Sequence, residues 1–180
     1  MLKPDPTARP DTYRVVYSQD PALRPVDMPA PPSDDADATD HEAFRAAVEA
    51  ALGERGNALR VARETRNYDA LLAGAERPTY FVCRWIPQAV RGRWNDQHRA
   101  AGGTMGLHDA LAQLLLLALV RVENFPTQPR LVHSNRFGCE MASEDFLDDL
   151  TRAVGHTRVG HLIRDVAGQI YEQEVATGPL

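Results

Sequence analysis

The longest apolar stretch of the chain runs from Ala110 to Val120, with Gln113 as its one polar residue. Apolar residues would occupy nearly every side of a helix over residues 107–120, and other parts of the protein have to cover such a helix. This pattern predicts a helical core built around one apolar helix. A second copy of the chain would cover it more easily than a monomer of 180 residues.

A strand and a polar helix precede this apolar helix. Residues 80–86 alternate in the manner of a strand, and the face expected to enter the core carries Phe81, Cys83 and Trp85. Residues 88–101 are largely polar, with Val90 and Trp94 at helical spacing. Residues 79–120 are therefore predicted to form a strand, a polar helix and an apolar helix in succession.

Shorter patterns of the same kind predict the remaining elements. Short strands are expected over residues 12–17 and 130–134. Helices are expected from Asp40 to a stop at Gly53, over about 58–72, from Ser143 to Gly155 and over about 159–175. The predicted fold class is mainly α with a few short strands, which is an α+β class.

The N-terminal part of the chain has a different composition. Residues 21–40 contain five prolines and five aspartates, which is typical of a segment without regular structure. Residues 1–40 are therefore predicted to be an acidic, proline-rich, largely flexible arm with one short strand. Residues 41–180 are predicted to form a single α-rich globular domain.

Charge is distributed unevenly along the chain. Residues 55–140 carry 12 Lys and Arg against 7 Asp and Glu, whereas residues 1–54 carry 5 against 11 and residues 141–180 carry 3 against 7. Of the 20 basic residues 19 are Arg, whose forked guanidinium suits phosphates and guanine edges. The basic middle therefore indicates nucleic acid, or else a compositional bias towards Arg.

Cysteine usage and hydropathy bear on the compartment. Cys83 and Cys139 lie in apolar or strand-like settings, which favours reduced thiols over a disulfide. The N-terminal residues do not resemble a signal peptide, and the run from Ala110 to Val120 is shorter than the roughly 20 residues of a membrane helix. A cytoplasmic protein without a membrane partner is expected.

Catalytic and metal-binding patterns are weak. The ligand-capable side chains gather in two short stretches, at His133, Cys139, Glu140, His156 and His161. His156 and His161 would point about 140° apart on one helix, and their spacing matches none of the common zinc patterns. Both also occupy positions where a helix-turn-helix usually has apolar residues, so a simple helical hairpin is expected around Gly155. A non-enzymatic protein without metal or cofactor is therefore expected.

One family pattern covers the centre of the chain. Phe81-Val-Cys-Arg-Trp85, Pro87, Val90, Trp94, Gly102 and Thr104 together resemble the ribbon-helix-helix DNA-binding proteins. The resemblance implies a homodimer whose paired strands enter the major groove. It would place Tyr80, Val82 and Arg84 in the groove, with Arg84 on a guanine, and Thr104 at a phosphate. Arg91 and Arg93, on the following helix, complete the expected DNA-binding residues.

Two functions from different classes follow from these patterns. The first is a nucleic-acid-binding homodimer, with DNA as the expected partner, that uses the basic central segment. The second is a protein-interaction or assembly subunit that uses the apolar helix at residues 107–120 and does not contact DNA. Salt distinguishes them, because phosphate contacts weaken steeply as ionic strength rises and apolar burial does not.

Overall fold

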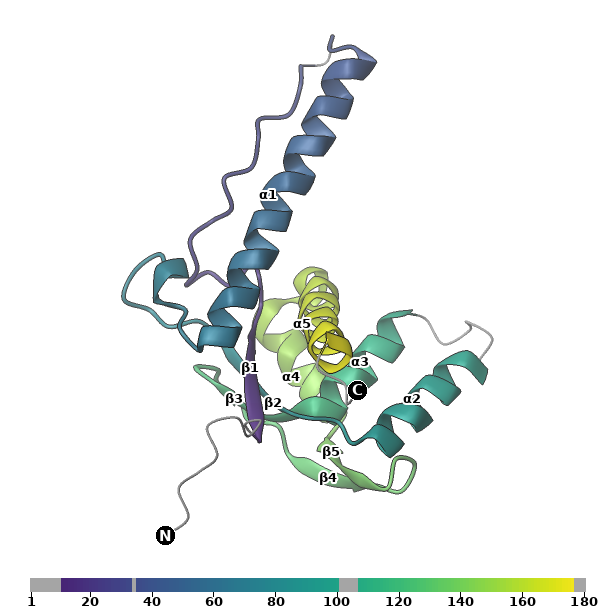
Figure 1. Cartoon of the computed structure of the whole chain (residues 1–180). Coiled ribbons are helices and arrows are strands. Elements are labelled where there is room, and N and C mark those ends of the chain that lie inside the picture. The colour runs from purple at the N-terminus through teal and green to yellow at the C-terminus, as the bar shows by residue number, and fades with distance from the viewer. Residues whose placement is uncertain (1–10, 34, 101–106, 177–180) are drawn as a thin grey trace. The chain divides into compact units, whose positions relative to one another are not determined.

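The computed structural model describes residues 11–33, 35–100 and 107–176 of the chain (Figure 1). It has the α+β class, because five helices and a few short antiparallel strands make up the described residues. The chain divides into two compact units. We call residues 1–17 with 79–180 the sheet unit and residues 18–78 the α1 unit. This division differs from the predicted boundary at residue 40, because the first strand and the first helix belong to different units.

A three-stranded antiparallel sheet organises the sheet unit. Its order is β1-β2-β3, and it is formed by β1 (Thr12–Val16), β2 (Tyr80–Arg84) and β3 (Leu119–Glu123). Val82 pairs with Arg14 on one side and with Arg121 on the other. The strand that the sequence predicts at the centre of the chain is therefore also the central strand of the sheet.

The apolar run builds the core of this unit. α3 (Leu107–Ala118) packs against α5 (His156–Ala176), and residues 114–119 are almost completely buried. The predicted helix to Val120 is wrong at its end, because Leu119 and Val120 already belong to β3. From Leu119 onward the chain pairs with β2, with a register shift between Val82 and Cys83, and the backbone hydrogen bonds of that pairing replace those of the helix.

The other elements of the sheet unit close around α3. α2 (Gln88–Ala100) buries the predicted stripe of Val90 and Trp94, and the indole N–H of Trp94 donates to the carbonyl of Ala110 at 3.1 Å. A hairpin and two helices follow β3, and their bounds are β4 (Leu131–Ser134), β5 (Cys139–Ala142), α4 (Asp145–Val154) and α5.

The α1 unit contains one long helix. α1 (Ala38–Thr65) begins at Asp37, whose carboxylate accepts from the backbone N–H groups of Thr39 and Asp40. The predicted stop at Gly53 is wrong, and the helix runs through this residue without a break. A glycine inside a helix costs only about 1 kcal/mol, which the alanine-rich sequence around it can offset.

The end of α1 also differs from the prediction. Arg66 closes the helix in the left-handed conformation, and only a short 3-10 turn, η1 (Asp69–Leu71), follows where a second helix was predicted.

The proline-rich segment, predicted to lack regular structure, runs alongside α1 (Figure 1), and the burial of its side chains repeats every three residues. Leu23 is buried, Val26, Pro29 and Pro32 are half-buried, and the described residues between them up to Ser33 are exposed. A period of three is that of a polyproline II helix, so this segment buries one face although it forms no helix or strand. Its start is held by backbone bonds from Arg24 to Leu71 and from Ala73 to Ala22.

Candidate functional site

The structure places the predicted DNA-reading strand in the interior of the sheet unit. Val82 is 1% exposed and Tyr80 is 9% exposed. Both edges of β2 are hydrogen-bonded, to β1 and to β3. The expectation that Tyr80 and Val82 face a DNA groove is therefore wrong, because a central strand has no free edge to pair with the same strand of a second chain.

Arg84 donates hydrogen bonds to other segments of its own chain. Its Nε donates to the carbonyl of Leu117 in α3 at 3.4 Å, and its guanidinium also donates to the carbonyl of Glu140 in β5. One guanidinium has five N–H donors, so it can join two main-chain segments that no backbone bond connects. Arg84 consequently ties β2 to α3 and β5 through its bonds to main-chain carbonyls.

Arg91 and Arg93 on α2 behave in the same way. Arg91 donates to the carbonyl of Glu174 at 2.8 Å, and Arg93 donates to the carbonyl of Phe137 at 2.6 Å. The Arg93 guanidinium lies against Gly138, where an added Cβ would come within 2.8 Å of its Nη1. Gly138 also has a φ of +62°, so both its backbone and its contact with Arg93 favour glycine. Thr104, the remaining predicted site residue, lies outside the described residues.

Glu174 is the centre of a buried polar cluster that the sequence reading did not find. It is 4% exposed, and its Oε1 accepts from the backbone N–H of Ile86 at 3.1 Å and from the hydroxyl of Tyr13 at 3.4 Å. Its Oε2 lies 3.8 Å from Arg91. Helical phase could have found it, because Glu174 follows Ile170 by four residues and therefore lies on the buried face of α5. This cluster joins the end of α5 to β1, to α2 and to the segment between β2 and α2.

Cys83 lies close to this cluster, in surroundings that disfavour its thiolate. Burial, together with the charge of Glu174, raises the pKa of the Cys83 thiol far above its ordinary value. Its Sγ donates to the carbonyl of Phe81 at 3.6 Å. A nucleophilic cysteine needs a thiolate, which burial beside a carboxylate disfavours. Both cysteines are free thiols, and Cys139 is half-buried.

The structure brings together only part of the predicted ligand-capable group. His133 and Glu140 are directly opposite each other in the β4–β5 pairing, and both are exposed. His156 and His161 lie on α5 and are exposed as well. Within the described residues, no three His, Cys, Asp or Glu side chains are placed to hold a metal ion.

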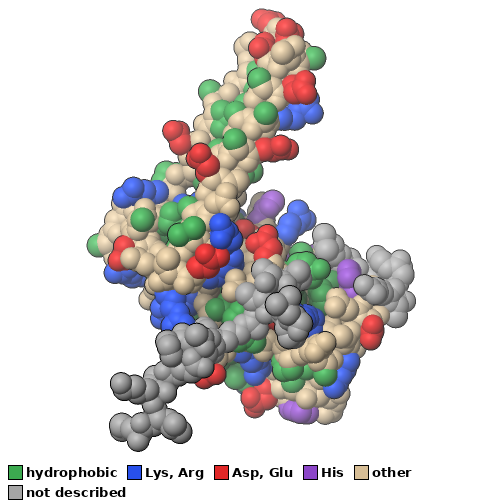
Figure 2. All heavy atoms as spheres, viewed as in Figure 1, with side chains coloured by type: hydrophobic (Ala, Val, Ile, Leu, Met, Phe, Trp, Pro, Cys, Tyr) green, Lys and Arg blue, Asp and Glu red, His purple; other side chains and the backbone are tan. Residues whose placement is uncertain are grey.

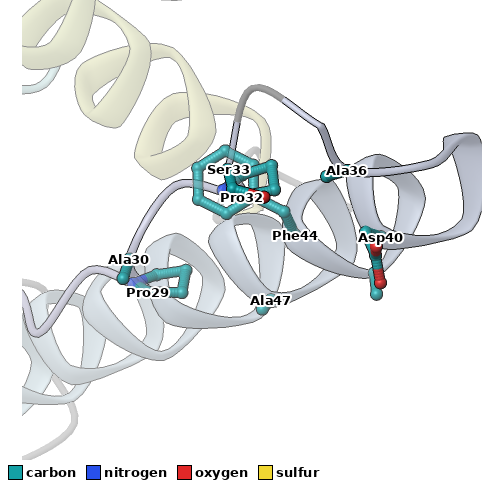
Figure 3. Close-up of a pocket in the computed structure, with 9 residues that line it drawn as sticks. Pro29, Ala30, Pro32, Ser33, Ala36, Asp40, Phe44 and Ala47 are labelled. Carbon is teal, nitrogen blue, oxygen red and sulfur yellow. The ribbon is translucent and has the colours of Figure 1, made fainter.

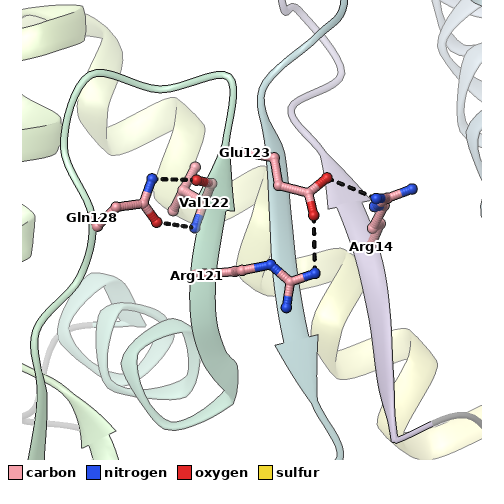
Figure 4. A network of polar contacts seen from close by, with 5 residues as sticks. All are labelled: Arg14, Arg121, Val122, Glu123 and Gln128. Atoms are coloured by element: carbon pink, nitrogen blue, oxygen red, sulfur yellow. Dashed lines mark hydrogen bonds and ion pairs between the residues drawn. The ribbon is translucent and has the colours of Figure 1, made fainter.

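The outer edge of the sheet is closed by a side chain. The amide of Gln128 bonds to both main-chain groups of Val122 in β3, accepting from its N–H at 3.1 Å and donating to its carbonyl at 2.5 Å (Figure 4). Beside it, Glu123 forms ion pairs with Arg14 at 2.8 Å and Arg121 at 3.0 Å. Gln128 occupies the donor and acceptor that an added strand would use.

The apolar helix does not offer the assembly surface that the sequence suggests. Leu114, Leu115, Leu116 and Leu117 are each 2% exposed or less. The other elements of one chain therefore already cover this part of α3, so a second copy of the chain is not required to bury it.

In the α1 unit, by contrast with α3, most residues of the helix are not buried. Of the 28 residues of α1, only Leu59, Ala62 and Arg63 are buried, and Leu52 is 50% exposed. An open groove of about 410 Å³ lies between the proline-rich segment and α1, and Phe44 and Pro32 are among its lining residues (Figure 3). Acidic side chains gather towards the N-terminal end of the helix (Figure 2). We call this surface, formed by the groove with Val48 and Leu52 beside it, the α1 face.

Comparisons with protein-family models, curated proteins and solved structures gave no match for this chain. In the part of the chain that the structure describes, every helix is too short or too polar to cross a membrane. The compartment stays a prediction from the sequence.

Proposed function

We propose that this protein is a non-enzymatic protein-interaction module that binds its partner through the α1 face. The observation that carries the proposal is the contrast between α1 and the apolar helix α3. Residues 114–118 of α3 are buried, whereas residues 38–58 of α1 contain no buried residue and yet carry apolar side chains at positions 44, 48 and 52. Positions four residues apart lie along one side of a helix, which is the usual arrangement of anchors in helix-mediated recognition.

The α1 face is also organised before any partner binds. Asp37 and Asp40 form a capping box at the start of α1, in which each carboxylate accepts a backbone N–H of the other residue. The proline-rich segment lies along one side of the helix, where Pro29 and Pro32 line the groove with the half-buried Phe44. A preformed helix loses less conformational entropy on binding than a segment that folds at that moment.

The use of arginine in the sheet unit supports a protein partner over a nucleic acid. Arg84, Arg91 and Arg93 all donate to main-chain carbonyls of their own unit. The α1 unit carries 12 Asp and Glu against 7 Arg, so its net charge repels phosphates. DNA binding and homodimer formation stay predictions from the sequence.

Two matched leucine variants test the proposal. Leu52→Asp alters the α1 face, and Leu131→Asp alters an exposed leucine of the sheet unit. Each full-length protein would be used to recover partners from the source cells, with quantitative mass spectrometry of what is retained. We expect Leu52→Asp to lose proteins that the wild type and Leu131→Asp retain, with all three proteins folded by circular dichroism.

The same test includes a measurement of DNA binding. Fluorescence anisotropy with labelled duplex DNA at low and high salt would compare the wild type with Arg84→Ala. The proposal fails if Leu52→Asp retains the same proteins as the wild type. It also fails if the wild type binds DNA in a salt-sensitive manner and Leu52→Asp has no effect on any association.

A further inference from the structure

The charge around the α1 face identifies the kind of partner it can hold. Residues 27–54 contain eight Asp and Glu and one basic residue, Arg45. Asp40 lies in the wall of the groove itself, beside Phe44 and Ala47 (Figure 3). Glu49 and Glu54 are exposed on the same stretch of α1 as Leu52. An apolar surface is thus surrounded mostly by negative charge, with Arg45 as the one basic residue of this stretch.

A second copy of the same surface is a poor occupant. Two such surfaces brought together would place about seven negative charges of each chain against those of the other, and like charges across an interface oppose association. The sheet unit has 13 acidic and 13 basic residues, and its arginines at positions 84, 91 and 93 are held by internal hydrogen bonds. The sheet unit therefore has no net positive charge, which favours a different protein as the source of the complementary charge.

We infer that the α1 face binds a basic amphipathic segment of another protein, with apolar residues on one side and Lys or Arg on the other. Its apolar side would cover Phe44, Val48 and Leu52, which extend along α1 from the groove. Its cations would lie against Asp40, Glu49 and Glu54. A basic amphipathic helix can make both kinds of contact, because it carries apolar side chains on one face and Lys or Arg on the other. This inference rests on the proposed function, since it assigns the partner of the same surface.

Three synthetic peptides of about 20 residues, long enough to form helices, separate the two requirements. The first has Leu on one helical face and Lys on the other, the second replaces every Leu by Ser, and the third replaces every Lys by Glu. Anisotropy with the full-length protein would measure each affinity. We expect the Lys/Leu peptide to bind about 10-fold or more tightly than the Lys/Ser peptide, because burial of a few apolar side chains is worth at least that factor. The Glu/Leu peptide should not bind.

Variants of the chain locate the binding. Leu52→Asp should weaken the Lys/Leu peptide about 10-fold, and the double variant Glu49→Lys with Glu54→Lys should weaken it and reduce its salt dependence. Leu131→Asp and Glu172→Lys change exposed residues of the sheet unit and serve as controls, with no change in affinity expected.

Each contrary outcome has a distinct meaning. Equal affinities for the Lys/Leu and Lys/Ser peptides would overturn the inference, because charge alone would then explain the binding. Binding of the Glu/Leu peptide that Leu52→Asp abolishes, or a dimer by light scattering that Leu52→Asp dissociates, would also overturn it while leaving the proposed function in place. If no peptide binds, and the partners recovered from cells are the same for Leu52→Asp and the wild type, the inference and the proposed function both fail.

Discussion

Charged side chains serve different purposes in the two units of this protein. In the sheet unit, Arg84, Arg91 and Arg93 donate to main-chain carbonyls of other segments, and the buried carboxylate of Glu174 accepts two hydrogen bonds and forms an ion pair with Arg91. In the α1 unit, most acidic side chains of residues 27–54 are exposed around an apolar surface. The comparison teaches that a charge in the sequence indicates a binding surface only if the fold leaves it accessible.

The largest effect on this comparison is expected from Glu174, the buried charge of the sheet unit. Glu174→Ala would remove the carboxylate that accepts from the N–H of Ile86 and the hydroxyl of Tyr13 and that forms an ion pair with Arg91, while the hydrogen bond from Arg91 to the carbonyl of residue 174 remains. Breaking a buried pair from one side costs about 3–5 kcal/mol of the free energy of unfolding. Urea denaturation would measure it, with Glu172→Ala on the exposed side of the same helix as a control that should change stability by less than about 0.5 kcal/mol.

Glu174→Gln distinguishes charge from hydrogen bonding at this position. The amide keeps an acceptor for Ile86 and Tyr13 but loses the attraction to Arg91. We expect it to be less destabilising than Glu174→Ala. A loss of stability for Glu174→Ala no larger than that for Glu172→Ala would contradict the assignment of Glu174 as the link between α5, β1, α2 and the segment that joins β2 to α2.

A pair of leucine truncations compares the two apolar helices directly. Leu115→Ala removes a fully buried side chain of α3, whereas Leu52→Ala shortens a half-exposed side chain of α1. We expect the first to cost about 2–5 kcal/mol, because it leaves a cavity, and the second about 0.5 kcal/mol or less. Thermal or urea unfolding of both variants would measure the difference. Similar losses for the two would mean that the α1 face is covered in the isolated protein and would count against its role in binding.

The prediction with the smallest expected effect concerns the two thiols, and it is tested by their rates of reaction with a thiol reagent. With Cys139→Ala as the background, Cys83 of the folded protein should react with a thiol reagent at least ~100-fold more slowly than in denaturant, because burial suppresses both access and the thiolate. The reciprocal variant, Cys83→Ala, should leave a half-buried Cys139 that reacts faster. Fast labelling of Cys83 in the folded protein would show that the interior of the sheet unit opens readily.

The raised pKa of Cys83 also has a consequence for stability. A thiol whose pKa is higher in the folded than in the unfolded protein contributes fully to stability below its unfolded pKa, and this contribution is lost as pH rises above that value. The free energy of unfolding should therefore decrease from about pH 7 towards about pH 10. In Cys83→Ala this part of the decrease should be absent. An identical pH dependence in the variant would show that other groups dominate.

Local patterns predicted most of the elements correctly. The alternation around Phe81, the stripe of Val90 and Trp94 and the apolar run from Ala110 gave β2, α2 and α3 close to their observed bounds. The fold class follows from such periodicities, because each depends on residues a few positions apart. The predictions were wrong where another effect was stronger than a local rule. Gly53 was expected to end a helix, but the alanine-rich sequence around it continues the helix to Thr65.

The candidate sites were predicted less well. The sequence indicated Tyr80, Val82 and Arg84 through a family pattern, and the fold buries the first two and engages the third. The period of three in the proline-rich segment was present in the sequence but becomes meaningful only beside α1, which provides the surface that Pro29 and Pro32 cover. A pattern that depends on a distant partner cannot be recognised from neighbouring residues alone.

The sequence by itself determined the class of fold, the apolar core of α3 and the acidic character of residues 27–54. The tertiary structure decided which charges are available, since it pairs Arg91 with Glu174 across 83 positions of the chain. It also decided that Gln128, and not another strand, closes the edge of β3. The physical reason is that helical and strand periodicity are local, whereas the partner of a buried donor or acceptor is selected by whichever distant group the fold brings within hydrogen-bonding distance.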